Sequence, residues 1–130
     1  MDLIADIKPQ NSTVEIKHPV TGEATGLVIE LRPMHDPAVK AVQKRIGDRR
    51  LKQAARNKAL TTDELENNTS EMLAATMIGW QWKGDASFNG KKLEFTPGNV
   101  AVVLAVDWIA GQIDEALGDN SRFFVKSGTN

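Results

Sequence analysis

Few side chains in this 130-residue sequence are of the types that carry out chemistry, and their spacing suits neither catalysis nor metal binding. His18 and His35 are the only histidines, and they lack the i, i+4 spacing of a zinc-binding helix. No serine lies in a nucleophile-elbow sequence, and adjacent carboxylates such as Asp63 and Glu64 point to different faces of a helix. The chain has no cysteine, so it has no thiolate nucleophile, disulfide or cysteine-bound metal. We therefore expect no enzyme activity, no metal and no other cofactor.

The strongest local signal is positive charge. The whole chain is nearly neutral, with 16 Lys and Arg against 17 Asp and Glu, but residues 36–60 hold eight cations and only two carboxylates. The candidate basic face consists of Lys44, Arg45, Arg49, Arg50, Lys52 and Arg56. A helix of this charge density can neutralise nucleic-acid phosphates, so a small nucleic-acid-binding regulator that uses the basic helix 36–60 is the alternative function.

We favour a solvated or ion-paired role for these cations over nucleic-acid binding. The next segment begins with the carboxylates Asp63, Glu64, Glu66 and Glu71, and an antiparallel helix places its acidic first turn beside the basic end. The basic segment also lacks aromatic side chains, whereas single-strand-binding modules interleave aromatics with cations for base stacking. Nucleic acid is therefore an unfavoured partner.

The aromatic side chains indicate protein binding. All three Trp and all four Phe residues follow residue 79, and there is no tyrosine. Because large aromatics dominate small cores, we assign three of them to the core, namely Trp80, Phe95 and Trp108. The other four lie in predicted turns or in the terminal segment and form the candidate partner-binding patch, namely Trp82, Phe88, Phe123 and Phe124.

Two strands are predicted near the N-terminus. Residues 13–17 and 26–32 alternate apolar and polar side chains, and the Pro19 to Gly22 segment between them suits the turn of an antiparallel hairpin. Residues 1–12 show no sustained period, and residues 125–130 end the chain, so both ends are expected to be flexible.

Two long helices follow the hairpin. Asp36 and Pro37 form a cap-and-proline start for a helix to about Leu60, which is long enough to project from the body or to bend near Gly47. Thr61 with Glu64 is a capping box, which predicts the start of a second helix. Its apolar side chains keep a spacing of three or four residues through Met77 to Trp80. The short connection predicts a long αα-hairpin.

The rest of the chain completes an α+β, mostly α-helical fold. Asn89-Gly90 predicts a small second hairpin, and Thr96-Pro97 begins a C-terminal helix that runs to Gly118 unless Asp107 splits it in two. No repeat or long linker divides residues 1–130, so we expect a single domain. The longest uncharged apolar run, 100–106, is too short to span a membrane, and the N-terminus lacks the regions of a signal peptide.

The second half of the chain resembles a known protein family. The resemblance rests on order and spacing in the runs Ile78–Gly84 and Phe88–Asn99, on Trp108-Ile109 with Gln112-Ile113, and on Phe123-Phe124. Together with the Pro19 to Gly22 hairpin and the long charged helix, these residues are similar to the tail assembly chaperones of long-tailed, lambda-like siphovirus bacteriophages. Gly98 departs from the pattern, in which an acidic residue is expected.

The resemblance implies a non-enzymatic assembly factor. Such chaperones bind the tape measure protein, keep it soluble and promote assembly of the tail tube around it in the host cell cytoplasm, and they are absent from the mature virion. A longer form made by programmed ribosomal frameshifting usually recruits the tail tube protein, and this chain would be the short form. Because coating a long partner takes many copies, weak self-association is also expected.

Overall fold

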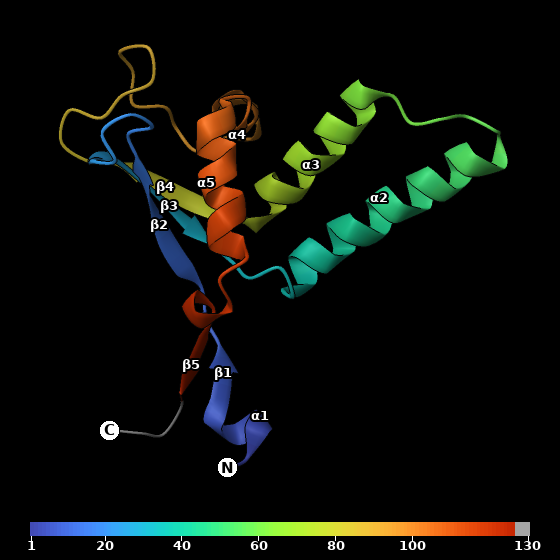
Figure 1. Cartoon of the computed structure of the whole chain (residues 1–130), viewed down its shortest axis with the longest axis horizontal. Helices are drawn as coiled ribbons and strands as arrows, with labels where there is room; N and C mark the ends of the chain where they lie inside the picture. The colour runs from blue at the N-terminus through green and yellow to red at the C-terminus, as the bar shows by residue number, and fades with distance from the viewer. Residues whose placement is uncertain (127–130) are drawn as a thin grey trace.

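A three-stranded antiparallel sheet with one apolar face is the centre of the fold (Figure 1). The structure is a computed structural model that describes residues 1–126. Strands β2 (Ser12–Lys17), β3 (Ala24–Leu31) and β4 (Met77–Trp82) lie in that order. Alternation places Ile16 and Ile29 on the buried face with no exposed surface. The N-terminal hairpin and the mixed α+β class are thereby confirmed.

Three helices cover the apolar face of this sheet. They are α4 (Pro97–Leu104), α5 (Asp107–Leu117) and the C-terminal end of α3 (Thr62–Thr76), whose Leu73 joins the same core cluster. The side chain of Thr96 accepts a hydrogen bond from the backbone N–H of Asn99, as its capping position predicts. The C-terminal segment is split before Asp107, so the two-helix alternative is the correct one.

Strand β4 corrects the predicted extent of the second helix. Met77 and Trp80 fit a helical spacing, but α3 ends at Thr76, and β4 pairs with β3 with Trp80 opposite Ile29 and Trp82 opposite Leu27. Between the pairs Glu30–Gly79 and Leu31–Met77 the register shifts by one residue of β4, and Met77 is buried in the core as well. Pairing with a distant strand therefore overrides the local helical pattern.

Helices α2 (Pro37–Ala55) and α3 form the predicted αα-hairpin, which extends away from the sheet (Figure 1). α2 begins at the Asp36 cap as predicted, but it ends at Ala55 instead of Leu60 and is uninterrupted at Gly47. Residues 56–61 form a longer connection than expected, opening with Asn57 at a φ of 55°. The projection of α2 is confirmed, and the bend is not found.

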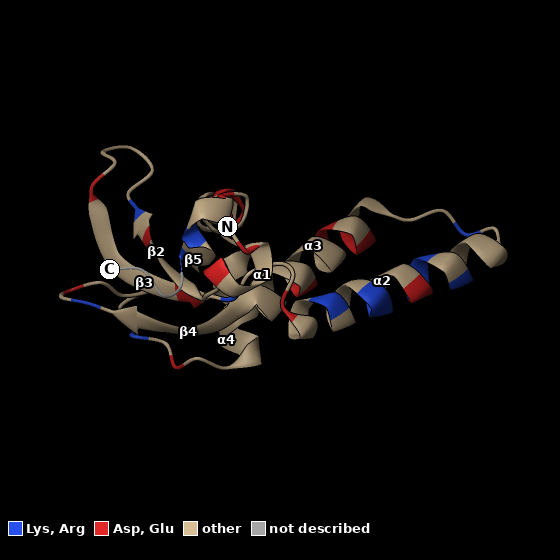
Figure 2. Cartoon of the chain, turned by 90° about the horizontal axis from the view of Figure 1, so that it is seen from below, with Lys and Arg blue, Asp and Glu red and all other residues tan. Residues whose placement is uncertain are grey.

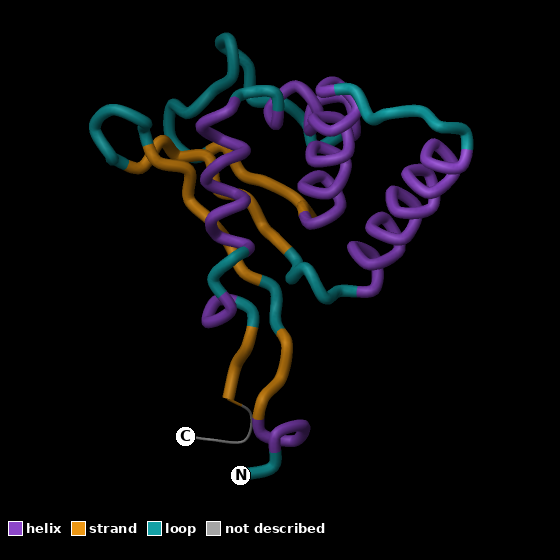
Figure 3. The backbone as a smooth tube through the Cα atoms, turned by 45° about the vertical axis from the view of Figure 1, so that its right-hand side comes forward, coloured by secondary structure: helices purple, strands orange, loops and turns teal. Residues whose placement is uncertain are grey.

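The two chain ends, where residues 1–12 and 125–130 were expected to be flexible, pair with each other through residues 7–9 and 124–126 in a projecting arm (Figure 3). A short helix α1 (Leu3–Asp6) leads into β1 (Ile7–Pro9), which pairs antiparallel with β5 (Phe124–Lys126). The backbone N–H of Gln10 donates to the carbonyl of Phe123 at 2.8 Å and fastens the base of this arm. The predicted free tail at 127–130 lies outside the described residues.

The second hairpin is smaller than predicted. Asn89 and Gly90 adopt φ values of 50° and 81°, which suit a tight hairpin turn. A single bridge between Phe88 and Lys91 closes the turn in place of a pair of strands. Residues 83–96 are therefore mainly a loop.

Phe123 and Phe124 provide a direct test of this core. Phe123 follows the short 3-10 helix η1 (Asn120–Arg122) and is 2% exposed, whereas Phe124 is 37% exposed. We expect Phe123→Ala to lower the free energy of unfolding by roughly 3–5 kcal/mol, because it leaves a cavity in the core. Phe124→Ala should cost much less. Urea denaturation of both variants measures the difference, and equal losses would contradict the placement of Phe123.

Candidate protein-binding site

The structure divides the predicted aromatic patch. Phe123 is buried in the core, so its assignment to the patch is wrong. Phe124 is exposed on the arm, where its ring stacks on His35 at a centroid distance of 5.1 Å. Trp82 and Phe88 are half-buried and lie together at one pocket, beside Trp108.

Two aromatics predicted for the core are partly exposed. Phe95 is 39% exposed and Trp108 is 41% exposed, whereas Trp80 is half-buried and packs against the core as expected. Trp108 lies in the first turn of α5, immediately after the break between the C-terminal helices. The exposure of Trp108 could have been predicted from this break, which Asp107 indicated in the sequence.

The pocket has a volume of about 170 Å³ and lies where three parts of the chain meet. These parts are the β2–β3 hairpin, the end of β4 with the loop 83–96, and the junction of α4 with α5. We name it the tryptophan pocket, and its main apolar lining is Leu27, Trp82, Phe88, Val106, Trp108 and Ile109.

Hydrogen bonds from two indoles hold one wall of the tryptophan pocket in place. The Nε1–H groups of Trp80 and Trp82 both donate to the carbonyl of Leu93, at 2.8 Å and 3.1 Å. The ammonium of Lys92 donates to the carbonyls of Trp82 and Gly84, each at 2.7 Å. The loop 83–96 is therefore fastened to β4 by side chains.

A glycine lets the same loop approach the N-terminal hairpin. Gly26 has a φ of 99°, and a Cβ built there would lie 2.5 Å from the carbonyl oxygen of Lys83 and 2.9 Å from the Cβ of Ala86. Only glycine fits both this backbone conformation and this approach. The pocket is thus preformed by backbone packing.

The size and lining of the tryptophan pocket suit one apolar side chain of a protein partner. Pockets for small-molecule ligands usually occupy about 300–1,000 Å³, and this one is smaller. Binding energy at protein interfaces concentrates where an aromatic or aliphatic anchor fills such a pocket. The pocket is lined by no ionisable side chain, so its chemistry is burial of apolar surface.

The predicted basic face is partly neutralised. Arg45 and Arg49 donate to the two carboxylate oxygens of Glu71, at 2.7 Å and 2.6 Å, and these bonds, the one from Arg45 first, lower the pKa of Glu71. Lys and Arg lie along α2 and carboxylates along α3 (Figure 2). The expected ion pairing of the hairpin is therefore present through Glu71, one of the four carboxylates named for it, although this residue lies beyond the first acidic turn of α3. The other members of the basic face, which are exposed and lie apart from the tryptophan pocket, are Lys44, Arg50, Lys52 and Arg56.

Comparisons with known proteins add no identification. No protein-family model matches the chain, and neither a curated protein nor a solved structure is significantly similar to it. Within residues 1–126 no group of three or more His, Asp or Glu is placed to hold a metal ion. Across the same residues, none of the helices combines the length and apolarity needed to cross a membrane.

The lowered pKa of Glu71 predicts an acid-dependent contribution to stability. Because the folded-state pKa lies below the ordinary value of 4.5, the contribution is complete above that value and is lost as the pH falls through the folded-state pKa. The side chains are partly exposed, so we expect Glu71→Gln to lower the free energy of unfolding at pH 7 by about 1 kcal/mol. Urea titrations of both proteins should converge as the pH is lowered below 4.5 and Glu71 becomes protonated. A difference that stays constant as the pH falls would show that the ion pairs do not contribute.

Proposed function

We propose that this chain is a non-enzymatic tail assembly chaperone of a long-tailed bacteriophage, which binds the tape measure protein and keeps it soluble while the tail tube assembles around it. The observation that carries the proposal is the tryptophan pocket, a preformed apolar site with Trp108 41% exposed at it. The family resemblance of the sequence supplies the identity of the partner.

The pocket suits the chemistry of a long helical partner. An amphipathic helix presents apolar side chains at intervals of three or four residues, and each is a separate anchor of the size that the pocket accepts. Covering these anchors one by one removes the surface through which such helices aggregate. Each contact contributes little, so coating depends on many copies, which agrees with weak self-association.

The wider cellular role follows from the same proposal. The chain acts in the host cell cytoplasm and is released before the virion is complete. A longer, frameshifted form recruits the tail tube protein, while the short form holds the tape measure protein.

Trp108→Ala tests the proposal without removing a hydrogen bond of the fold, because Trp108 forms none of those that fasten the loop. The chain is co-expressed with the long helical protein encoded immediately downstream, and the soluble, co-purifying fraction of that partner is measured. Loss of a central aromatic anchor typically costs about 2 kcal/mol, so we expect affinity to fall roughly 30-fold.

Phe124→Ala is the matched control, since it removes an exposed aromatic outside the pocket. It should leave capture unchanged, and circular dichroism should show that both variants are folded. Equal capture by the Trp108→Ala variant and the unaltered chain would contradict the assignment of the pocket.

A further inference from the structure

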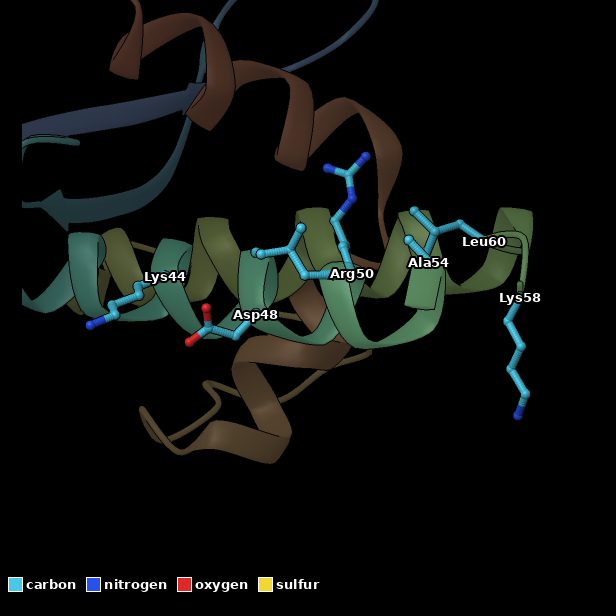
Figure 4. Close-up of a pocket in the computed structure, with 8 residues that line it drawn as sticks. Lys44, Asp48, Arg50, Ala54, Lys58 and Leu60 are labelled. Atoms are coloured by element: carbon cyan, nitrogen blue, oxygen red, sulfur yellow. The ribbon is translucent and has the colours of Figure 1, made fainter. Parts of the chain in front are cut away.

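One flank of α2 carries a groove that the fold does not use. It is shallow, about 640 Å³, and follows the helix toward the connection 56–61 (Figure 4). We name it the α2 groove. Its floor is formed by Gly47, Leu51, Ala54 and Leu60, and its charged rim by Lys44, Asp48, Arg50 and Lys58.

The apolar floor of the α2 groove is not explained by packing within the chain. Leu51 is 71% exposed near the C-terminal end of the helix, while the buried residues of α2, Val39 and Ile46, are not groove residues. A Cβ added at Gly47 would meet nothing within 4 Å. Since glycine in a helix interior is destabilising relative to alanine, the fold alone gives no reason for a glycine here.

The rim gives the α2 groove a positive charge. Arg50 projects to one side of the groove and Lys58 to the other (Figure 4), and Asp48 is the only carboxylate in the lining. Among the residues that the structure describes, Lys44, Arg50 and Lys58 form no ion pair, in contrast to Arg45 and Arg49 on the opposite flank. The cations at the groove are therefore available to carboxylates from outside.

The geometry matches a helix with an apolar ridge bordered by acids. From Lys44 to Ala54 the groove follows α2 for about 15 Å, which is roughly three turns of a partner helix. The missing side chain at Gly47 allows close approach of the two backbones. Leu51 and Leu60 would contact the ridge while the rim cations meet the bordering carboxylates.

We propose that the α2 groove binds an acidic amphipathic helix of another protein, at a site separate from the tryptophan pocket. Nucleic acid would use the cations but would leave the apolar floor uncovered, and Arg45 and Arg49, which would extend a phosphate-binding face, are already held by Glu71. The apolar floor thus favours a helix over a phosphate backbone.

The test uses the full chain and three labelled probes. The first is a 16-residue helical peptide with leucines at intervals of three and four residues and glutamates beside them, the second carries lysines in place of those glutamates, and the third is a single-stranded oligonucleotide. Fluorescence anisotropy at low salt gives each affinity. We expect the acidic peptide to bind at least tenfold more tightly than the basic peptide, and its affinity to fall as salt is added.

Four variants assign the binding to the groove. The double variant Lys44→Glu with Lys58→Glu should lower the affinity for the acidic peptide about tenfold, and so should the single variant Leu51→Ser. Lys52→Glu is the matched control, because Lys52 is an exposed cation of α2 outside the groove, and it should have less than a twofold effect. Gly47→Ala should raise the thermal unfolding midpoint while weakening binding, which separates a binding role from a structural one.

Four results would overturn the proposal. The first is no preference for the acidic peptide, and the second is binding that survives Leu51→Ser. The third is tight oligonucleotide binding that survives Leu51→Ser, which would assign the cations to nucleic acid. Self-association that disappears in the Leu51→Ser variant, measured by sedimentation without peptide, would assign the groove to a second copy instead. Trp108→Ala should leave peptide binding unchanged, so failure here is distinct from failure of the proposed function.

Discussion

The small apolar face of the three-stranded sheet is the constraint on which the rest of the structure depends. This face is covered by α4, α5 and the end of α3, all of which contribute to one core cluster. Val39 and Ile46 of α2 are buried but lie outside that cluster. α2 therefore packs mainly on α3 and projects from the body, with polar contacts to Glu71 and Glu64 along the hairpin.

The same small sheet needs protection at its β2 edge, and side chains supply it. The amide of Gln112 on α5 accepts from the N–H of Lys17 at 2.7 Å and donates to its carbonyl at 2.9 Å, in place of a neighbouring strand. Arg122 donates to the carbonyl of Thr13 at 3.3 Å farther along. Because open strand edges promote uncontrolled pairing between molecules, these side-chain contacts protect the β2 edge.

Local signals in the sequence predict local structure well here. The alternation in 13–17 and 26–32 and the caps at Asp36, Thr61 and Thr96 are all found where expected. What the sequence does not reveal depends on distant partners. β4 and the β1–β5 arm exist through pairing with strands far along the chain, and propensity within a window carries no information about that pairing.

The candidate site follows the same rule. Trp82 at the end of β4 and Phe88 beside the Asn89-Gly90 turn both border the loop 83–96 and are half-buried, whereas Phe123 is buried after η1 at the base of the arm, which no short-range pattern indicates. Trp108 is exposed at the pocket only because α5 begins immediately before it. Thus two of the four predicted patch residues, Trp82 and Phe88, lie at the pocket. The position of the third aromatic there, Trp108, depends on how α4 and α5 meet.

The claim that the tryptophan pocket holds an apolar side chain of the partner is tested most directly by NMR. A ¹⁵N-labelled chain has three indole N–H signals, which Trp→Phe variants assign, and it is titrated with an amphipathic helical segment of the downstream protein. The account predicts that the signals of Trp82 and Trp108 shift together and saturate with one binding isotherm. Binding that leaves both indoles unperturbed while backbone signals shift on the open face of the sheet, at Glu15 and Glu30, would contradict it.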